Sequence, residues 1–276
     1  MLEAAALRLA GSETPIADAE ALFRGVSGFS RADILTRGGD AVPEALERAV
    51  SLAVSRRVSH EPIQYILGRA AFWRDEFVVT PAVLIPRPET EGLVEEVARR
   101  LRPTSSPRIL DLGTGSGCIA LSVLRECPSA RALAVDVSQE ALAVARENAA
   151  RLHLSARIEF RCSDWFDGIP AGEAFDAIVS NPPYVAPSDR DSLHRTVRDF
   201  EPAQALFAEA PDGLSSYRAI IGGAFVRLPP LGLIALEVGQ GQAARVGKLL
   251  RDAGFGKVET KKDLASIDRV LLAQKS

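Results

Sequence analysis

Cysteine is scarce in this chain, and its three copies exclude two kinds of small scaffold. Cys118, Cys127 and Cys162 are odd in number and lack paired C-x-x-C spacing. They therefore indicate neither a disulfide framework nor a structural zinc site, and we expect no bound metal. Cysteine usage of this kind fits a reducing compartment, so we expect the cytoplasm.

The chain also lacks long hydrophobic runs and an excess of basic residues. No apolar stretch reaches the length of a membrane span, and the N-terminal MLEAAALRLAGSETP has no basic segment followed by an unbroken apolar core. A net charge of −3 and a pI near 5.8 argue against binding nucleic acid mainly through its phosphates. We therefore expect a soluble protein with no membrane partner and no direct nucleic-acid partner.

The 276 residues include 47% hydrophobic and 25% charged residues, enough for one large α/β domain with a smaller appendage. Residues 1–68 carry few strand signals. PEALERAVSLAVSRR begins with Pro43, a favourable first helical position, and its apolar residues recur at helical spacing. We predict that 1–68 form a small helical domain that docks on something larger.

Residues 69–86 are predicted to form a β-hairpin linker, because FW and FVV flank a polar RDE turn. Over residues 87–276 strands alternate with helices, which is typical of a mostly parallel, doubly wound α/β sheet. The predicted strands are 108–112, 131–136, 157–163, 175–180, 231–238, 257–262 and 268–274. The predicted helices follow Gly117 and Ser138 and span 213–227 and 241–252.

A glycine-rich turn, DLGTGSG, follows the first of these strands and contains Gly113, Gly115 and Gly117. Glycine suits this place because the backbone must turn sharply and a ligand must approach it without meeting a Cβ. The next strand ends at Asp136, whose carboxylate can accept hydrogen bonds from both hydroxyls of a ribose. The spacing indicates a cofactor that carries a nucleoside.

Two cofactors compete for such a turn. The NAD fingerprint is G-x-G-x-x-G, whereas this turn is G-x-G-x-G preceded by Asp111, the arrangement seen with S-adenosylmethionine (SAM). SAM has no pyrophosphate to seat on a helix N-terminus, and Asp111 can face its cationic group. A turn that only joins strand to helix would explain the glycines but not Asp136. Asp164 and Trp165 end the third strand where an adenine would lie, although a core tryptophan is an alternative.

The fourth strand ends in SNPPY, residues 180–184. Ligands of open α/β sheets bind outside the carboxyl ends of the strands, so this motif is expected beside the methyl group of SAM. Prolines contribute no N–H donor and leave nearby carbonyls free to accept, and the Asn181 oxygen is a second acceptor. Two acceptors suit a planar NH₂ group on an sp² carbon, either an amide or the exocyclic amine of a base. Tyr184 is expected to supply an aromatic wall.

With these residues identified, the chain resembles the HemK/PrmC family of release factor glutamine methyltransferases over nearly its whole length. The resemblance is carried by EPIQYILGRAAFW, VLIPRPETEGLVE, ILDLGTGSGCIALSV, SNPPYV, FEPAQALFA, DGLSSYRAII and LEVGQGQ. NPPY alone is shared with amino-methyltransferases of DNA. IPRPETE before the glycine turn, with EP…AL and GL..YR after NPPY, is more particular to the family.

The resemblance implies a SAM-dependent methyltransferase (Rossmann-like) sheet with a small N-terminal helical domain that helps to recognise the substrate. It implies methylation of the glutamine N5 in the Gly-Gly-Gln motif of peptide chain release factors, without a metal. The residues implied to contact SAM are Gly113, Thr114, Gly115, Ser116, Gly117, Asp136, Trp165 and Asn181. The residues implied to hold the glutamine are Asn181, Pro182, Pro183 and Tyr184, with Asn181 and Pro182 carrying the catalysis.

Some assignments stay open on the sequence alone. Arg87, Glu89 and Thr90 either border the same pocket or, for the last two, start a helix with an acid in its first turn. The substrate could instead be a ribosomal protein glutamine, or a flipped base of DNA or RNA. A non-catalytic SAM-binding protein is disfavoured because the NPPY motif is intact.

Overall fold

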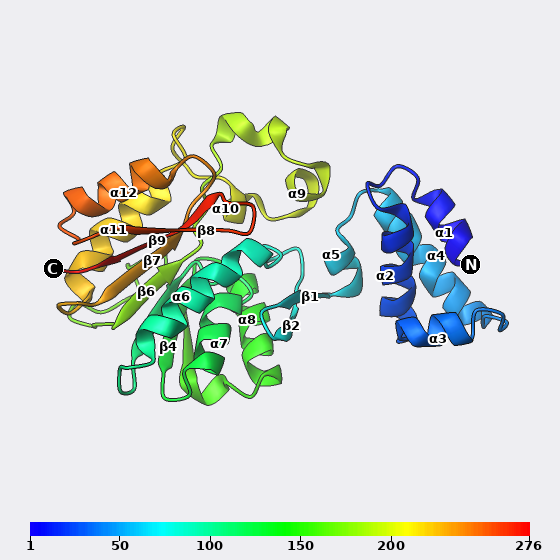
Figure 1. The fold of residues 1–276 in the computed structure, drawn as a ribbon, viewed down its shortest axis with the longest axis horizontal. Coiled ribbons are helices and arrows are strands. Elements are labelled where there is room, and N and C mark those ends of the chain that lie inside the picture. Colours follow the sequence, from blue (N-terminus) through cyan, green and yellow to red (C-terminus); the bar gives the residue numbers. More distant parts are fainter. The chain divides into compact units, whose positions relative to one another are not determined.

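The computed structural model describes residues 1–276 and divides the chain into two compact units (Figure 1). One unit comprises Met1–Arg69 and His194–Phe200, and the other comprises Ala70–Leu193 and Glu201–Ser276. A short segment from the second half of the chain therefore belongs to the N-terminal unit. No helix in the structure combines the length and the apolar character needed to cross a membrane.

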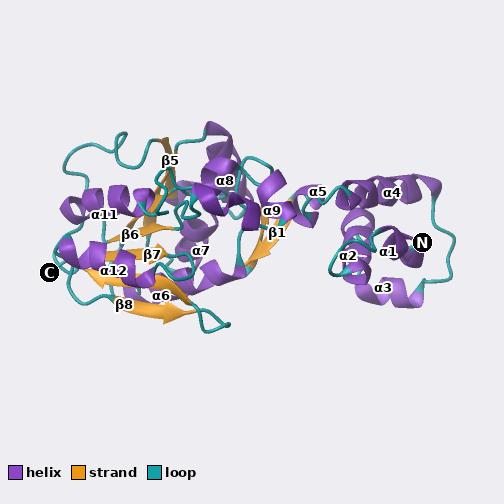
Figure 2. Cartoon of the chain, turned by 90° about the horizontal axis from the view of Figure 1, so that it is seen from above, coloured by secondary structure: helices purple, strands orange, loops and turns teal.

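Residues 1–68 contain helices and loops without strands (Figure 2). The longest helix starts at Glu44, one residue later than predicted, with Pro43 as its N-cap, and it buries Val50 and Val54 against Leu22 of a second helix. Beside them Asp18 forms a buried ion pair with Arg57, 2.7 Å from Nε to Oδ2. The helices of this unit are α1 (Leu2–Arg8), α2 (Pro15–Ser27), α3 (Arg31–Thr36), α4 (Glu44–Val58), α5 (Ile63–Leu67) and α9 (Arg195–Phe200).

The second unit is built on a seven-stranded sheet with the order β5-β4-β3-β6-β7-β9-β8. The first five strands of this order pair in parallel, and β9 pairs antiparallel with both β7 and β8. Each predicted strand is present, at most two residues shorter at an end, and the fold class is confirmed. The strands are β3 (Arg108–Leu112), β4 (Arg131–Asp136), β5 (Ile158–Cys162), β6 (Ala177–Ser180), β7 (Leu233–Glu237), β8 (Glu259–Lys262) and β9 (Asp268–Gln274).

Helices cover both faces of the sheet (Figure 1). Successive side chains of β3 point to opposite faces, so Ile109 joins the core beneath one helical layer and Leu110 the core beneath the other. The first layer consists of α6 (Glu91–Leu101), α7 (Cys118–Glu126) and α8 (Gln139–Arg151). The second consists of α11 (Ser215–Arg227) and α12 (Ala243–Asp252), and the short α10 (Ala203–Leu206) precedes it in the chain.

The predicted hairpin is formed by β1 (Arg69–Phe72) and β2 (Asp75–Val78). Its turn lies at Trp73 and Arg74 rather than at the RDE triplet, and the Trp73 indole N–H donates to Glu126 at 3.0 Å. The Asn148 amide bonds both the N–H and the C=O of Val78, at 2.7 and 3.0 Å. The hairpin is thus anchored to α8 of the second unit.

The strand order places the site. The chain runs from β3 outward to β4 and β5 and then returns to the opposite side of β3 as β6. The carboxyl ends of β3 and β6 therefore lie side by side where the order reverses, which is where open α/β sheets bind ligands. The glycine turn follows β3 and SNPPY completes β6, so the two motifs meet at this edge.

Candidate active site

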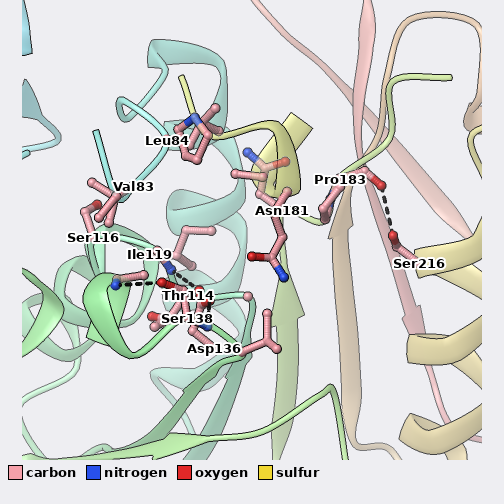
Figure 3. A pocket seen from close by; sticks show the side chains of 18 of the residues that line it. Val83, Leu84, Thr114, Ser116, Ile119, Asp136, Ser138, Asn181, Pro183 and Ser216 are labelled. Carbon is pink, nitrogen blue, oxygen red and sulfur yellow. Dashed lines mark hydrogen bonds between the residues drawn. The ribbon is translucent and has the colours of Figure 1, made fainter. Parts of the chain in front are cut away.

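A cavity of about 590 Å³ opens at this edge of the sheet (Figure 3). Its volume lies in the range usual for small-molecule and cofactor sites. The walls are the glycine turn, the ends of β4, β5 and β6, the segment 82–87, and residues around 202–219. Segments far apart in the sequence therefore share one pocket.

The glycine turn is held by backbone hydrogen bonds to the next strand. The amides of Gly113 and Thr114 both donate to the Val135 carbonyl at 2.9 Å. Gly117 has a φ of +81°, and a Cβ there would meet Leu121 Cδ1 at 3.1 Å. Glycine suits this position because the left-handed backbone conformation disfavours a side chain, and Leu121 would have to shift to admit one.

Asp136 ends β4 and is anchored by two backbone amides. Its Oδ2 accepts from the Gly115 N–H at 2.9 Å, and its Oδ1 accepts from the Ser138 N–H at 3.0 Å. Burial raises the pKa of this carboxyl, although the backbone hydrogen bonds act in the opposite direction. Each carboxylate oxygen has a second lone pair. The group borders the cavity and can accept further hydrogen bonds from a ligand.

Asp111 does not border the cavity, in contrast to the expectation that it faces a cationic ligand. The side chain is fully buried, and its Oδ2 accepts from the Thr114 hydroxyl at 2.7 Å and from the Ala120 N–H at 3.3 Å. Its Oδ1 has no partner in the protein. Burial raises the pKa of Asp111 to about 7. Asp111 therefore stabilises the turn from beneath and acts on a ligand only through its charge.

Trp165 lies at the end of β5, beside the glycine turn. A Cβ on Gly113 would lie 3.8 Å from its Cζ3 atom, and both Asp164 and Trp165 border the cavity. The tryptophan backbone has a φ of +42°, in the left-handed region that disfavours bulky residues. Ser163 stabilises this conformation, since its hydroxyl donates to the Trp165 carbonyl at 3.0 Å.

The four NPPY residues divide between the cavity and its support. Asn181 and Pro183 border the cavity, and Figure 3 shows the Asn181 side chain pointing into it toward Thr114 and Asp136. The Pro183 carbonyl is occupied by the Ser216 hydroxyl at 3.0 Å. Pro182 is buried and does not line the cavity, and no donor of the chain bonds its carbonyl.

Tyr184 lies outside the cavity lining, so it is not the expected aromatic wall. A Cβ on Gly239 would lie 2.9 Å from its Cδ2, and the Tyr184 carbonyl accepts from Gln242 Nε2 at 3.0 Å. Burial raises the pKa of the phenol to about 12. Gly213, with a φ of +71°, approaches the same carbonyl so closely that a Cβ would meet it at 2.7 Å. Tyr184 and these glycines support the NPPY turn from behind.

The IPRPETE segment contributes three residues to the cavity, Pro86, Arg87 and Thr90, whereas Glu89 does not line it. Arg87 Nη2 donates to Glu201 Oε1 at 2.5 Å, and the same carboxylate accepts from the Ile85 N–H at 3.1 Å. Thr90 donates its hydroxyl proton to Glu237 at 2.6 Å. The Thr90 oxygen in turn lies 3.3 Å from Asn181 Nδ2, which donates to it.

Sequence reasoning assigned no role to Glu201, Ser216 and Glu237, which hold the cavity residues in place. Glu237 ends the otherwise apolar strand LIALE. Its side chain is 2% exposed, and burial raises its pKa to about 7. An acidic residue at the end of an otherwise apolar strand is the sequence signal from which a role for Glu237 could have been predicted.

Comparison with known proteins agrees with this geometry. Family models match residues 1–68 as a PrmC N-terminal domain and residues 90–216 as a methyltransferase small domain. A release factor glutamine methyltransferase of Bordetella pertussis is 45% identical over 95% of this chain and 96% of its own length. The enzyme of the same name from Neisseria gonorrhoeae is 44% identical over 95% of this chain and 94% of its own length. That of Caulobacter vibrioides is 41% identical over 98% of this chain and 93% of its own length.

The chain belongs to the release factor glutamine methyltransferase family. The resemblance to the HemK/PrmC family is thereby confirmed, and the protein is a SAM-dependent methyltransferase.

Solved structures support the fold of this family member. The hMettl16 catalytic domain, solved with MAT2A 3′UTR hairpin 6, matches with a TM-score of 0.58 and 17% identity over 82% of this chain and 81% of its own. The T. Thermophilus 16S rRNA N2 G1207 methyltransferase was solved in complex with AdoMet and guanosine. It matches with a TM-score of 0.55 and 22% identity over 75% of this chain and 50% of its own. At these identities the likeness concerns the fold alone.

The cavity of this family member suits the cation SAM. Its acidic lining residues outnumber its one basic residue, Arg87, which is paired with Glu201. The acidic residues are Asp136, Glu140, Asp164 and Glu209. Beneath the glycine turn, Asp111 Oδ1 and Ser116 Oγ are buried without a partner. A positive ligand would offset the cost of these buried acceptors, because an opposite charge favours the ionised carboxyl.

Proposed function

We propose that this protein transfers the methyl group of SAM to the side-chain amide nitrogen, N5, of the glutamine in the Gly-Gly-Gln motif of peptide chain release factors. The names of its relatives at 41–45% identity support this substrate. The three cysteines are free, which fits action in the reducing cytoplasm. The N-terminal helical unit is proposed to contribute to release-factor recognition.

The glycine turn, Asp136, Trp165 and Asn181 are proposed to hold SAM. In this assignment residues 113–117 lie along the methionine part, the free lone pairs of Asp136 accept from the ribose hydroxyls, and Trp165 lies against the adenine. SAM supplies a methyl group on a positively charged sulfur, which is a good leaving group. All three contacts come from the carboxyl ends of adjacent strands, β3, β4 and β5.

The observation that carries the proposed chemistry is the hydrogen bond made by the side-chain amide of Asn181. Its amide nitrogen is already engaged by Thr90, so its oxygen is the end left to accept a hydrogen bond in the cavity. The Pro182 carbonyl has no donor within the chain and is the second proposed acceptor. Pro183 and Tyr184 shape and support the same turn.

Two acceptors act on a substrate amide in two ways. They hold both N–H bonds, so that the face of the nitrogen is directed at the methyl carbon. They also favour the form in which the nitrogen lone pair is less delocalised, because the N–H groups become more acidic as positive charge develops on nitrogen. No side chain of the motif is a strong base, so positioning accounts for most of the proposed rate enhancement.

Methyl-labelled SAM, incubated separately with release factors, ribosomal proteins and DNA, tests this function. We expect one methyl group on the glutamine of the Gly-Gly-Gln motif, located by mass spectrometry, and none on a release factor with alanine at that glutamine. Label found only in a ribosomal protein or in DNA would overturn the substrate assignment.

A further inference from the structure

Three polar side chains from three separate segments form a chain of hydrogen bonds that ends in the cavity. Glu237 ends β7, Thr90 closes the 3₁₀ turn Pro88–Thr90, and Asn181 follows β6. Thr90 Oγ1 lies 2.6 Å from Glu237 Oε2 and 3.3 Å from Asn181 Nδ2. Thr90 and Glu237 are each 2% exposed, so water cannot readily replace either bond.

From this geometry we infer that Glu237 and Thr90 are positioning residues that fix the orientation of the Asn181 amide, with its oxygen toward the substrate nitrogen. The inference rests on the proposed function, because an acceptor at this place is useful only for a substrate that donates N–H bonds.

With Glu237 ionised, the available protons allow only one orientation of the Asn181 amide. An ionised carboxylate only accepts hydrogen bonds, and a threonine hydroxyl has a single proton. Thr90 must therefore give that proton to Glu237, which leaves only lone pairs for Asn181. The NH₂ end of the Asn181 amide can satisfy them, whereas its oxygen would face another oxygen. The carbonyl end is consequently turned away from Thr90.

The reverse orientation of Asn181 would prevent the proposed chemistry. Its NH₂ group would then meet the NH₂ group of the substrate glutamine, donor against donor. One of the two acceptors would be lost, and with it the alignment of the nitrogen toward the methyl group. A change in Thr90 or Glu237 should therefore lower kcat more than it weakens SAM.

This chain of hydrogen bonds from Glu237 through Thr90 to Asn181, here called the relay, depends on the ionised form of Glu237. Burial raises its pKa to about 7, and a protonated Glu237 could donate to Thr90, which would free the threonine proton for the Asn181 oxygen. Besides Thr90, the charged and titratable groups acting on Glu237 are Arg87, Glu89, Cys118, Tyr184, Tyr217 and Arg269. Only the arginines favour its ionised form. Correct orientation is therefore expected to increase as the pH rises through about 7.

Substitutions of Thr90 separate hydrogen bonding from packing. Thr90→Val keeps the shape and removes the hydroxyl, and Thr90→Ser keeps the hydroxyl. With a release factor as substrate, we expect Thr90→Val to lower kcat at least tenfold and to change the Kd of SAM, measured by calorimetry, less than threefold. Thr90→Ser should recover kcat to within threefold of wild type. Thr260→Val on the exposed face of β8 is the control for the same substitution and should match wild type.

Substitution of Glu237 supplies a pH readout that packing alone would not change. In wild type, kcat should rise as the pH increases through about 7, and Glu237→Gln should have a lower kcat without this rise. Equal kcat of Thr90→Val and wild type would overturn the inference. So would equal losses in Thr90→Ser and Thr90→Val, or an unchanged pH profile in Glu237→Gln.

A measurement without substrate separates this inference from the proposed function. The ¹⁵N and proton shifts of the Asn181 side-chain amide, followed by NMR, should titrate with a midpoint near 7 in wild type and lose that titration in Glu237→Gln. The titration supports the relay even if no release factor is methylated. Its absence in an enzyme that methylates release factors would refute the relay and leave the function standing.

Discussion

Replacing Asp136 with alanine should weaken the binding of SAM through the ribose and leave the methyl-transfer residues untouched. The carboxylate accepts from two backbone amides, Gly115 at 2.9 Å and Ser138 at 3.0 Å. Its four lone-pair positions therefore leave two for the ribose hydroxyls. A hydrogen bond to a charged group contributes about 1.5–3 kcal/mol, and water that enters the vacated space recovers part of it.

We expect a net loss of about 1–3 kcal/mol in Asp136→Ala, which corresponds to a Kd for SAM about 5- to 160-fold higher. Asp136→Asn should recover only part of this loss, because its NH₂ group replaces one acceptor and faces a donor. Calorimetry with SAM and with S-adenosylhomocysteine, which has the same ribose but no sulfonium charge, tests the reasoning. Both should weaken by a similar factor in Asp136→Ala. Unchanged affinity, or a loss confined to SAM, would refute the ribose assignment.

Three further perturbations test other parts of the site. Asn181→Ala should abolish methyl transfer to a release factor and retain much of the SAM affinity; wild-type activity in this variant would remove its proposed role. Gly213→Ala should destabilise the fold by about 1–3 kcal/mol in denaturant unfolding, because it combines a φ of +71° with a Cβ 2.7 Å from the Tyr184 carbonyl. Gly222→Ala is the matched control within α11, where a Cβ meets nothing within 4 Å, and it should be neutral or stabilising; equal destabilisation of both would contradict the steric argument. The folded protein binds a proton at Asp111 more tightly than the unfolded chain does, since its pKa rises from 3.8 to about 7. The free energy of unfolding without SAM should therefore fall as the pH rises across that window, and Asp111→Asn should reduce the fall; an identical pH profile would show that Asp111 does not titrate there.

Local pattern was sufficient for most elements of the second unit, which carries the active site. The strand RILDL was predicted with its observed bounds because a short apolar run ends at a glycine turn. In the N-terminal unit, the helix at Pro43 was predicted to within one residue of its start, because proline suits the beginning of a helix. The hairpin turn was placed one to two residues too late. Trp73 adopts a φ of +57°, unusual for a tryptophan, and is held there by hydrogen bonds to Glu91 and Glu126, which lie far along the chain.

The direction in which a side chain points was harder to predict. Asp111 and Tyr184 both lie within two residues of a residue that lines the cavity, yet one is buried beneath the glycine turn and the other packs against Gly239. The alternation of side chains holds only along a regular strand, and the tight turns that follow β3 and β6 redirect the residues beyond them. Sequence proximity to a motif therefore does not place a residue in the pocket.

By itself the sequence determined the fold class, the family and the two motifs that face each other across the switch point, because each follows from residues close together in the chain. Tertiary structure alone decided how Asn181 is oriented. Thr90 lies 147 residues before Glu237 and 91 residues before Asn181 in the chain. Only the pairing of β6 with β7 and the packing of the segment before α6 bring the three residues within hydrogen-bond distance. The orientation of that amide depends on where one proton goes, and this is determined by a buried carboxylate distant in the sequence.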